Sequence, residues 1–209
     1  MKTVKTVLIT AFEAFGGDAM NPTEQILAEL PDFLFNAKII KKTLPVVYNE
    51  VFDYVKPLIE HYQPAVILML GLAAGRTHVN IERIAINVCD SKSPDNKGNI
   101  LSEQVIEKEG RDGYFTTLPL ETIMSRLKKK QLPVQVSNTA GAYVCNNLMY
   151  HVLHYIHKED LSIAAGFIHV PYLPEQVIDK PGVASLDKQI MIECILTIID
   201  ELINPIEQV

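Results

Sequence analysis

The residue best suited to covalent chemistry in this sequence is a cysteine at the start of a predicted helix. In the segment SNTAGAYVCNNLMYHVLHYI, apolar residues recur every three or four positions, which predicts a helix that begins near Ala142 or Tyr143 and carries Cys145 in its first turn. Unpaired backbone N–H groups and the positive end of the helix dipole stabilise a thiolate there, so we expect a lowered thiol pKa. A buried core thiol is the competing interpretation, and it is the one we adopt for Cys89 and Cys194.

A thiolate nucleophile needs an imidazole that takes its proton and a third group that orients the ring. His169 ends the apolar stretch GFIHVP, which predicts a strand whose carboxyl end lies at the sheet edge where the cysteine helix starts. Glu82, which stands just before a predicted strand at 83–88, is the favoured carboxylate, because a charge among apolar positions needs a partner. Glu13 and Asp95 are its rivals.

Three further histidines, His151, His154 and His157, recur every three residues on the same predicted helix. No carboxylate motif of the HExxH kind accompanies them, so a solvated helix face is favoured over a metal site. Arg83 adjoins Glu82 in the sequence, but it is expected on the opposite face of its strand and is therefore a poor partner for that carboxylate.

Strand-like and helix-like segments alternate along the chain and would position these groups. Short apolar runs such as AVILMLGL are typical of strands buried on both faces, and the alternation predicts an α/β sandwich with ligands near the carboxyl ends of the strands. The predicted strands are 4–12, 65–72, 83–88, 134–138 and 163–170, and the predicted helices are 48–62, 120–130, 143–157 and 185–203, with one more starting at Asn21. The segment 90–119 is too long for a plain connector and suggests a hairpin, a lid or a subunit contact.

Composition and charge exclude several classes of protein. The chain has 209 residues, with 19 Lys and Arg against 25 Asp and Glu, and its net charge of −6 disfavours nucleic acid and anionic membranes as partners. Its length favours one domain over residues 1–209. An odd cysteine count and the absence of CxxC spacing argue against a disulfide framework or zinc site and favour the cytoplasm. We read the apolar N-terminal stretch as a strand rather than a secretory signal.

Aromatic residues and glycine turns suggest a small pocket beside the cysteine. Phe12 and Phe15 flank the first glycine turn, and Tyr143 stands two residues before Cys145. Neither this turn nor the one at 71–76 matches a dinucleotide fingerprint or a P-loop, so nucleotide binding has little support. Glycine allows main-chain groups to approach a ligand closely, which suits a small neutral molecule.

The chain resembles the pyroglutamyl peptidase I family, also called pyrrolidone-carboxylate peptidase. Four segments in the family's order carry the likeness and span almost the whole chain: TAFEAFGGDAMNPTEQ, GLAAGRTHVNIERIAINVCDSKSPDNKG, SNTAGAYVCNNLMYHVLHYI and GFIHVPYLPEQ. The resemblance implies a cysteine exopeptidase, an omega peptidase that removes an N-terminal pyroglutamyl residue. It implies Cys145 as the nucleophile, His169 as the general base and acid, and Glu82 as the group that orients the histidine.

The resemblance also implies the other properties of the protein. Phe12, Phe15 and Tyr143 would line the pocket for the lactam ring, backbone groups at Leu72 would bond its amide, and Asn21 would help to shape the pocket. The family's fold is a three-layer α/β/α sandwich around a mostly parallel twisted sheet. Its bacterial members are commonly cytoplasmic homotetramers without cofactors or metal.

The sequence departs from the family's pattern at several positions. Lys92 stands where the family has an arginine thought to stabilise charge near the thiol; lysine keeps the charge and loses the planar fork. Leu72 and Ala74 replace a glutamine and a glycine, and Ala11 and Ala14 replace a glycine and a proline. Two alternative functions stay open at this point: a nucleoside phosphorylase-like enzyme, and a noncatalytic binding protein on the same scaffold.

Overall fold

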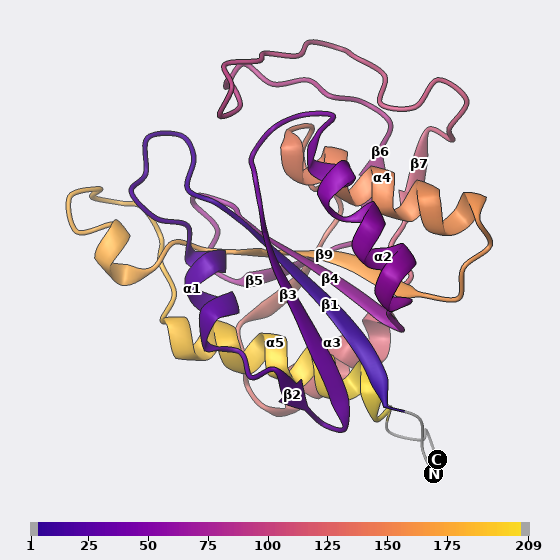
Figure 1. Ribbon diagram of the computed structural model, residues 1–209. Coiled ribbons are helices and arrows are strands. Elements are labelled where there is room, and N and C mark those ends of the chain that lie inside the picture. Colours follow the sequence, from indigo (N-terminus) through magenta and orange to yellow (C-terminus); the bar gives the residue numbers. More distant parts are fainter. Residues whose placement is uncertain (1–3, 206–209) are drawn as a thin grey trace.

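The computed structural model describes residues 4–205 and has a twisted seven-stranded sheet between two layers of helices (Figure 1). The strands follow one another across the sheet in the order β2-β3-β1-β4-β9-β5-β8. Four of them run parallel: β1 (Lys5–Phe12), β3 (Ala37–Leu44), β4 (Val66–Leu72) and β9 (Ala164–Val170). Three run the other way: β2 (Phe33–Leu34), β5 (Val79–Glu82) and β8 (Val134–Ser137). This arrangement confirms the predicted mostly parallel α/β fold.

Helices cover both faces of the sheet, and each layer has its own apolar core. The helices α1 (Pro22–Glu29), α3 (Leu120–Lys129) and α5 (Lys188–Ile203) pack on one face. The helices α2 (Lys56–Tyr62) and α4 (Val144–Lys158) cover the other, together with a small hairpin of β6 (Ile84–Ile86) and β7 (Gly113–Phe115) (Figure 1). Short 3-10 helices lie at Val51–Tyr54 and Pro174–Gln176.

The central strands form where the sequence is apolar without interruption. Every residue of β4 is buried, and so are the last six of β9, because helices cover both faces of these strands. At the start of α1, Asn21 caps the helix by accepting a hydrogen bond from the Thr23 backbone N–H, and Pro22 occupies the first helical position. The helix predicted to start at Asn21 is therefore confirmed.

Two predicted elements differ in the structure. The segment 48–62 is not one helix but a 3-10 turn followed by α2, because Asn49 takes a positive φ of 61° and Pro57 is suited only to a first helical turn. The predicted strand 83–88 contributes only β6, in the separate hairpin, while Glu82 ends β5 of the main sheet. Strand β3 was not predicted because its lysines, as in AKIIKKTL, hide its alternation of buried and exposed residues.

The long segment 90–119 forms mostly irregular structure above the helix layer that contains α4 (Figure 1). It is tied down by an isolated bridge between Cys89 and Gln104 and by the pairing of β7 with β6, so a hairpin is part of it. Three of its apolar side chains are more than half exposed: Ile100, Val105 and Phe115. Among residues 4–205, none of the helices has the length and apolar character needed to cross a bilayer.

Candidate active site

Cys145 lies in the first turn of α4, as predicted, with Tyr143 in extended conformation at the N-cap. Its side chain rests on β4 at Gly71, where a Cβ atom would lie only 3.1 Å from the Cys145 Sγ. The residue is 9% exposed, so the thiol is almost enclosed between the helix and the sheet. A glycine at this point of β4 is what allows the sulfur to approach the strand so closely.

The expected lowering of the Cys145 pKa is wrong. Burial, and then the negative charge of Glu82, raise the thiol pKa to about 12, against an opposing contribution from a backbone N–H at the helix start. Desolvation penalises the thiolate more than the helix terminus stabilises it. The raised pKa favours a neutral thiol at Cys145.

His169 and Glu82 form a buried pair on the neighbouring strands β9 and β5. The His169 Nδ1 lies 2.8 Å from Glu82 Oε1, and their side chains are 6% and 0% exposed. Because a carboxylate accepts hydrogen bonds, Nδ1 donates to Glu82, and Nε2 is the ring nitrogen that can serve as a base. The second carboxylate oxygen, Oε2, is buried without a hydrogen-bond partner in the described part of the chain. The rival carboxylates bond elsewhere: Glu13 to Asn96, and Asp95 to its own turn.

Strand pairing places the thiol and the imidazole on the same face of the sheet. Gly71 of β4 is in register with His169 of β9, and paired residues on neighbouring strands point to the same side. Since the Cys145 sulfur rests against Gly71, it lies on the side of the sheet that carries the His169 ring. Asn80 of β5 is in turn paired with His169, and Glu82 stands two residues further along the same strand face.

The predicted pocket aromatics fall into two neighbouring groups. The ring of Tyr143 lies 6.1 Å from that of Phe15 and 5.4 Å from that of Tyr48. Phe12 instead contacts Phe167 at 6.4 Å, and Phe167 lies 4.7 Å from the His169 ring. All of these aromatics belong to or pack against one apolar cluster with Cys145. Tyr48 and Phe167 were not predicted, although the position of Phe167 two residues before the histidine on one strand was a usable signal.

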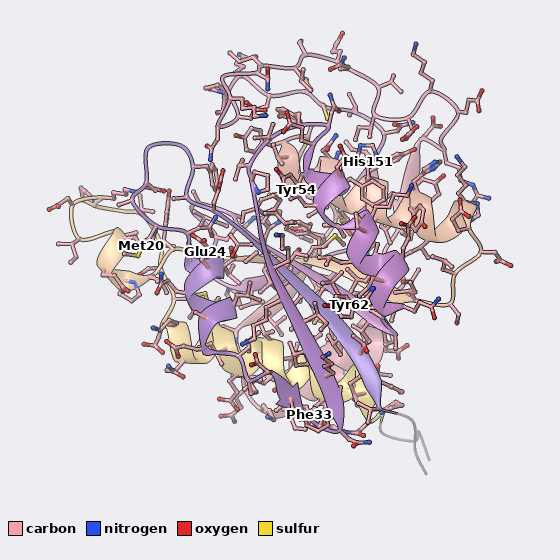
Figure 2. The ribbon with its side chains drawn as sticks, in the orientation of Figure 1. Met20, Glu24, Phe33, Tyr54, Tyr62 and His151 are labelled. Atoms are coloured by element: carbon pink, nitrogen blue, oxygen red, sulfur yellow. The ribbon has the colours of Figure 1, made fainter. Side chains whose placement is uncertain are left out.

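The loop that carries Phe15 is anchored on both sides. Asn21 is buried and donates from Nδ2 to the Glu13 carbonyl, and Asn96 donates to the Ala14 carbonyl. Met20 lies between this loop and the segment after β9 (Figure 2), where the Gln176 side chain donates to the Met20 carbonyl. The Asp18 carboxylate accepts hydrogen bonds at 2.7 Å from Lys180 and 2.8 Å from Tyr172.

The remaining predicted site residues are Lys92 and Leu72. Lys92 is exposed and takes part in no ion pair among residues 4–205. The side chain of Leu72 is 7% exposed, at the last position of β4. Among residues 4–205, no hydrogen bond or ion pair joins the Lys92 side chain to His169 or Glu82, and the apolar Leu72 side chain can form neither.

The three helical histidines are packed more closely than a solvated face. His151 (Figure 2) stacks on Phe52 with ring centroids 5.4 Å apart, and His154 hydrogen-bonds the Tyr114 hydroxyl at 3.0 Å. Burial lowers the pKa of His151. The prediction of a solvated face holds only for His157, because Phe52 covers His151 and Tyr114 of β7 covers His154. In the part of the chain that the structure describes, no cluster of His, Cys, Asp and Glu has the makings of a metal site.

Comparison with known proteins agrees with this geometry. A family model described as pyroglutamyl peptidase matches residues 5–204. The pyrrolidone-carboxylate peptidase 1 of Caldanaerobacter subterraneus subsp. tengcongensis is 42% identical over 198 residues, which cover 95% of this chain and 98% of that protein. A pyrrolidone-carboxylate peptidase of Thermoanaerobacter pseudethanolicus is 43% identical over 193 residues, or 92% of this chain and 95% of that one.

A solved structure extends the likeness to the fold. The pyroglutamyl peptidase I of Bacillus amyloliquefaciens superposes with a TM-score of 0.93 at 32% identity, over 99% of this chain and 100% of that chain. Neither a nucleoside phosphorylase nor a noncatalytic binding protein is supported by these matches. On its sequence and its fold, the chain belongs to the pyroglutamyl peptidase family of cysteine peptidases.

Proposed function

We propose that this protein is a cysteine-type hydrolase that removes an N-terminal pyroglutamyl residue from peptides through a thioester on Cys145. The observation that carries the proposal is the buried His169–Glu82 hydrogen bond of 2.8 Å on the sheet face that also receives the Cys145 thiol. Membership of the pyroglutamyl peptidase family supplies the substrate class. We treat residues 1–209 as one domain without a cofactor.

In this proposal the reaction begins with a neutral Cys145 thiol, which its raised pKa favours, and with His169 Nε2 as the base. As the substrate carbonyl approaches, His169 Nε2 takes the thiol proton, and the sulfur attacks the pyroglutamyl carbonyl carbon. Glu82 accepts the Nδ1–H bond throughout and stabilises the imidazolium that forms. N–H groups of the first turn of α4 stabilise the oxyanion.

The tetrahedral intermediate then collapses to the acyl-enzyme, which water hydrolyses, and His169 moves the protons in both steps. The His169 imidazolium gives its proton to the leaving amine nitrogen as the carbon–nitrogen bond breaks, which leaves a thioester. A water molecule, deprotonated by the same imidazole, attacks the thioester carbonyl and releases free pyroglutamate and the Cys145 thiol. Lys92 supplies positive charge near the site in this proposal, by family resemblance.

The proposed pocket for the lactam ring lies on the β1 side of the thiol. Phe12, Phe15 and Tyr143 supply apolar contacts, and Asn21 fixes the loop between them through the Glu13 carbonyl. The Ala73 N–H donates to the Val170 carbonyl of β9. Successive residues of a strand direct their N–H and C=O groups to opposite sides, so those of Leu72 point toward β1. The pairing of β1 with β4 ends before this point, at Thr10 and Met69, which supports backbone recognition of the lactam at Leu72.

The test is hydrolysis of pyroglutamyl-coumarin amide by the purified protein. Cys145→Ser and His169→Ala should each reduce kcat by at least about 1000-fold with an unchanged circular dichroism spectrum. Glu82→Gln should cost less, because it orients the base without transferring the proton. Iodoacetamide should label Cys145 with a matching loss of activity. Equal turnover by wild type and Cys145→Ser would refute the proposal.

We also propose a cytoplasmic homo-oligomer, a tetramer by family resemblance. The exposed apolar side chains of the segment 90–119, Ile100, Val105 and Phe115, are suited to a contact between subunits. Peptides are the proposed partners, with no nucleic acid and no membrane, in keeping with the net charge of −6. Sedimentation equilibrium of the wild type, and of Phe115→Ser, would test the assembly.

A further inference from the structure

A second polar group stands beside the proposed catalytic residues. Asn80 of β5 is fully buried, and its Oδ1 accepts hydrogen bonds from Arg76 Nη1 at 2.8 Å and from Gln135 Nε2 at 2.6 Å. Its Nδ2 donates to the His78 carbonyl at 2.5 Å. The amide is therefore fixed on every side, and it fixes the guanidinium of Arg76 in turn.

Strand pairing sets the order of these groups across the sheet. Four residues on neighbouring strands are paired one with the next and form a row on one face of the sheet. In order, they are Gly71 of β4, His169 of β9, Asn80 of β5 and Gln135 of β8. The opposite face carries apolar residues such as Ile81 and Ile168. The thiol rests over the first member of the row, and Arg76 reaches the row from the loop that crosses from β4 to β5.

This order gives the bound peptide a direction. The proposed lactam pocket lies on the β1 side of the thiol, and β1 is the neighbour of β4 on the side away from β9. The leaving nitrogen must face His169, which protonates it, so the residue that follows the scissile bond extends toward Asn80 and Arg76. Its carboxyl carbon lies about 2.5 Å beyond that nitrogen, and the next strand is about 4.8 Å from His169. These spacings place the carboxyl group of the first leaving residue on the side of the thiol where Asn80 holds the Arg76 guanidinium.

Arg76 is equipped to bind an anion there. Its side chain is half-buried, and no carboxylate lies within ion-pair distance of it among residues 4–205, in a protein whose net charge is −6. Only Nη1 is engaged by a side chain, so further N–H donors of the planar fork are available to a ligand. Because Asn80 holds the fork in place, little side-chain entropy is lost on binding.

We propose that Arg76, held by Asn80 and flanked by Gln135, forms a subsite for the free α-carboxylate of the residue directly after the scissile bond, so that pyroglutamyl dipeptides are preferred over their C-terminal amides. This inference rests on the proposed pyroglutamyl peptidase activity. Arg76 contacts the substrate in it, and Asn80 is a positioning residue.

The experiment compares kcat/KM for pyroglutamyl-alanine and pyroglutamyl-alanine amide, with released pyroglutamate quantified by chromatography. We expect the wild type to favour the free acid by at least about tenfold, and Arg76→Gln to reduce this ratio to about one. The matched control is Arg83→Gln, which removes the same charge from an exposed side chain that bonds Asn138. The control should keep the wild-type ratio.

Two further measurements keep the outcomes distinct. Gln135 is exposed, so Gln135→Leu should fold even if Arg76→Gln does not, and it should reduce the acid-to-amide ratio about threefold. Equal rates for acid and amide in an active wild type, or a ratio unchanged by Arg76→Gln and by Gln135→Leu, would overturn the subsite alone. Failure of the wild type to cleave pyroglutamyl-coumarin amide would overturn the proposed function, and the subsite with it.

Discussion

The Cys145 sulfur packs against β4 at Gly71, and a single methyl group added there tests the site. In Gly71→Ala the new Cβ would lie 3.1 Å from the Cys145 Sγ and 2.7 Å from two ring carbons of Phe167. Normal carbon contacts are about 3.5–4.0 Å, so the ring must move by about 0.8–1.3 Å and the sulfur by about 0.4–0.9 Å. The strand backbone itself tolerates alanine, because Gly71 does not have a positive φ.

The displacement sets the expected magnitude. Overpacking of this kind costs about 1–3 kcal/mol of unfolding free energy, and a reacting group misplaced by about 1 Å can cost about 100-fold in rate. We therefore expect Gly71→Ala to fold with a Tm reduced by about 2–12 °C. Its kcat/KM for pyroglutamyl-coumarin amide should fall by about 30- to 100-fold. The assay measures the released fluorescent coumarin at a temperature where the variant is fully folded.

A glycine on the other face of the sheet provides the control. In Gly166→Ala of β9, the added Cβ would clash with Leu118 Cδ1 and Thr116 Oγ1, on the sheet face away from the Cys145 cluster. Gly166→Ala should lose at least as much stability as Gly71→Ala and keep kcat/KM within about threefold of wild type. The reasoning is refuted if Gly71→Ala stays within threefold of wild type, or if both variants lose activity equally.

Two further outcomes follow from buried groups. Burial, and then Glu193, raise the pKa of Cys194 to about 12 from 9.0, so its stabilising contribution is complete below pH 9 and is lost as the pH rises toward 12. Between pH 9.5 and 11, the unfolding free energy should therefore fall less steeply with pH in Cys194→Ala than in the wild type, by up to about 1.4 kcal/mol per pH unit. Urea titrations at several pH values measure this slope, and equal slopes in the two proteins would contradict the prediction. Asp95 accepts hydrogen bonds from Tyr48, Lys97 and Asn99 in the turn whose Pro94 carbonyl receives the Tyr143 hydroxyl. Asp95→Ala should raise KM for the coumarin amide about tenfold with a smaller change in kcat, and a loss in kcat alone would show that the turn does not position the pocket.

Local patterns in the sequence were sufficient for the two elements that carry Cys145 and His169, but not for β5, which carries Glu82. The periodicity after Tyr143 predicted α4 with Cys145 in its first turn, and the apolar run before Pro171 predicted β9 with His169 near its end. Both signals are local, because a helix or a buried strand repeats its pattern within a few residues. The residues themselves favoured Glu82 over the rival carboxylates Glu13 and Asp95, and the family resemblance supplied the substrate class.

Only the tertiary structure decided how these residues meet. The neighbours of His169 are Gly71 and Asn80, from strands about 90 residues away in the chain, and no local pattern shows that β5 runs antiparallel to β9. The neutral state of the thiol likewise depends on desolvation by packing against β4, which outweighs the helix terminus that the sequence revealed. Helix and strand formation depend on nearest neighbours, whereas register and burial depend on every segment that packs around them.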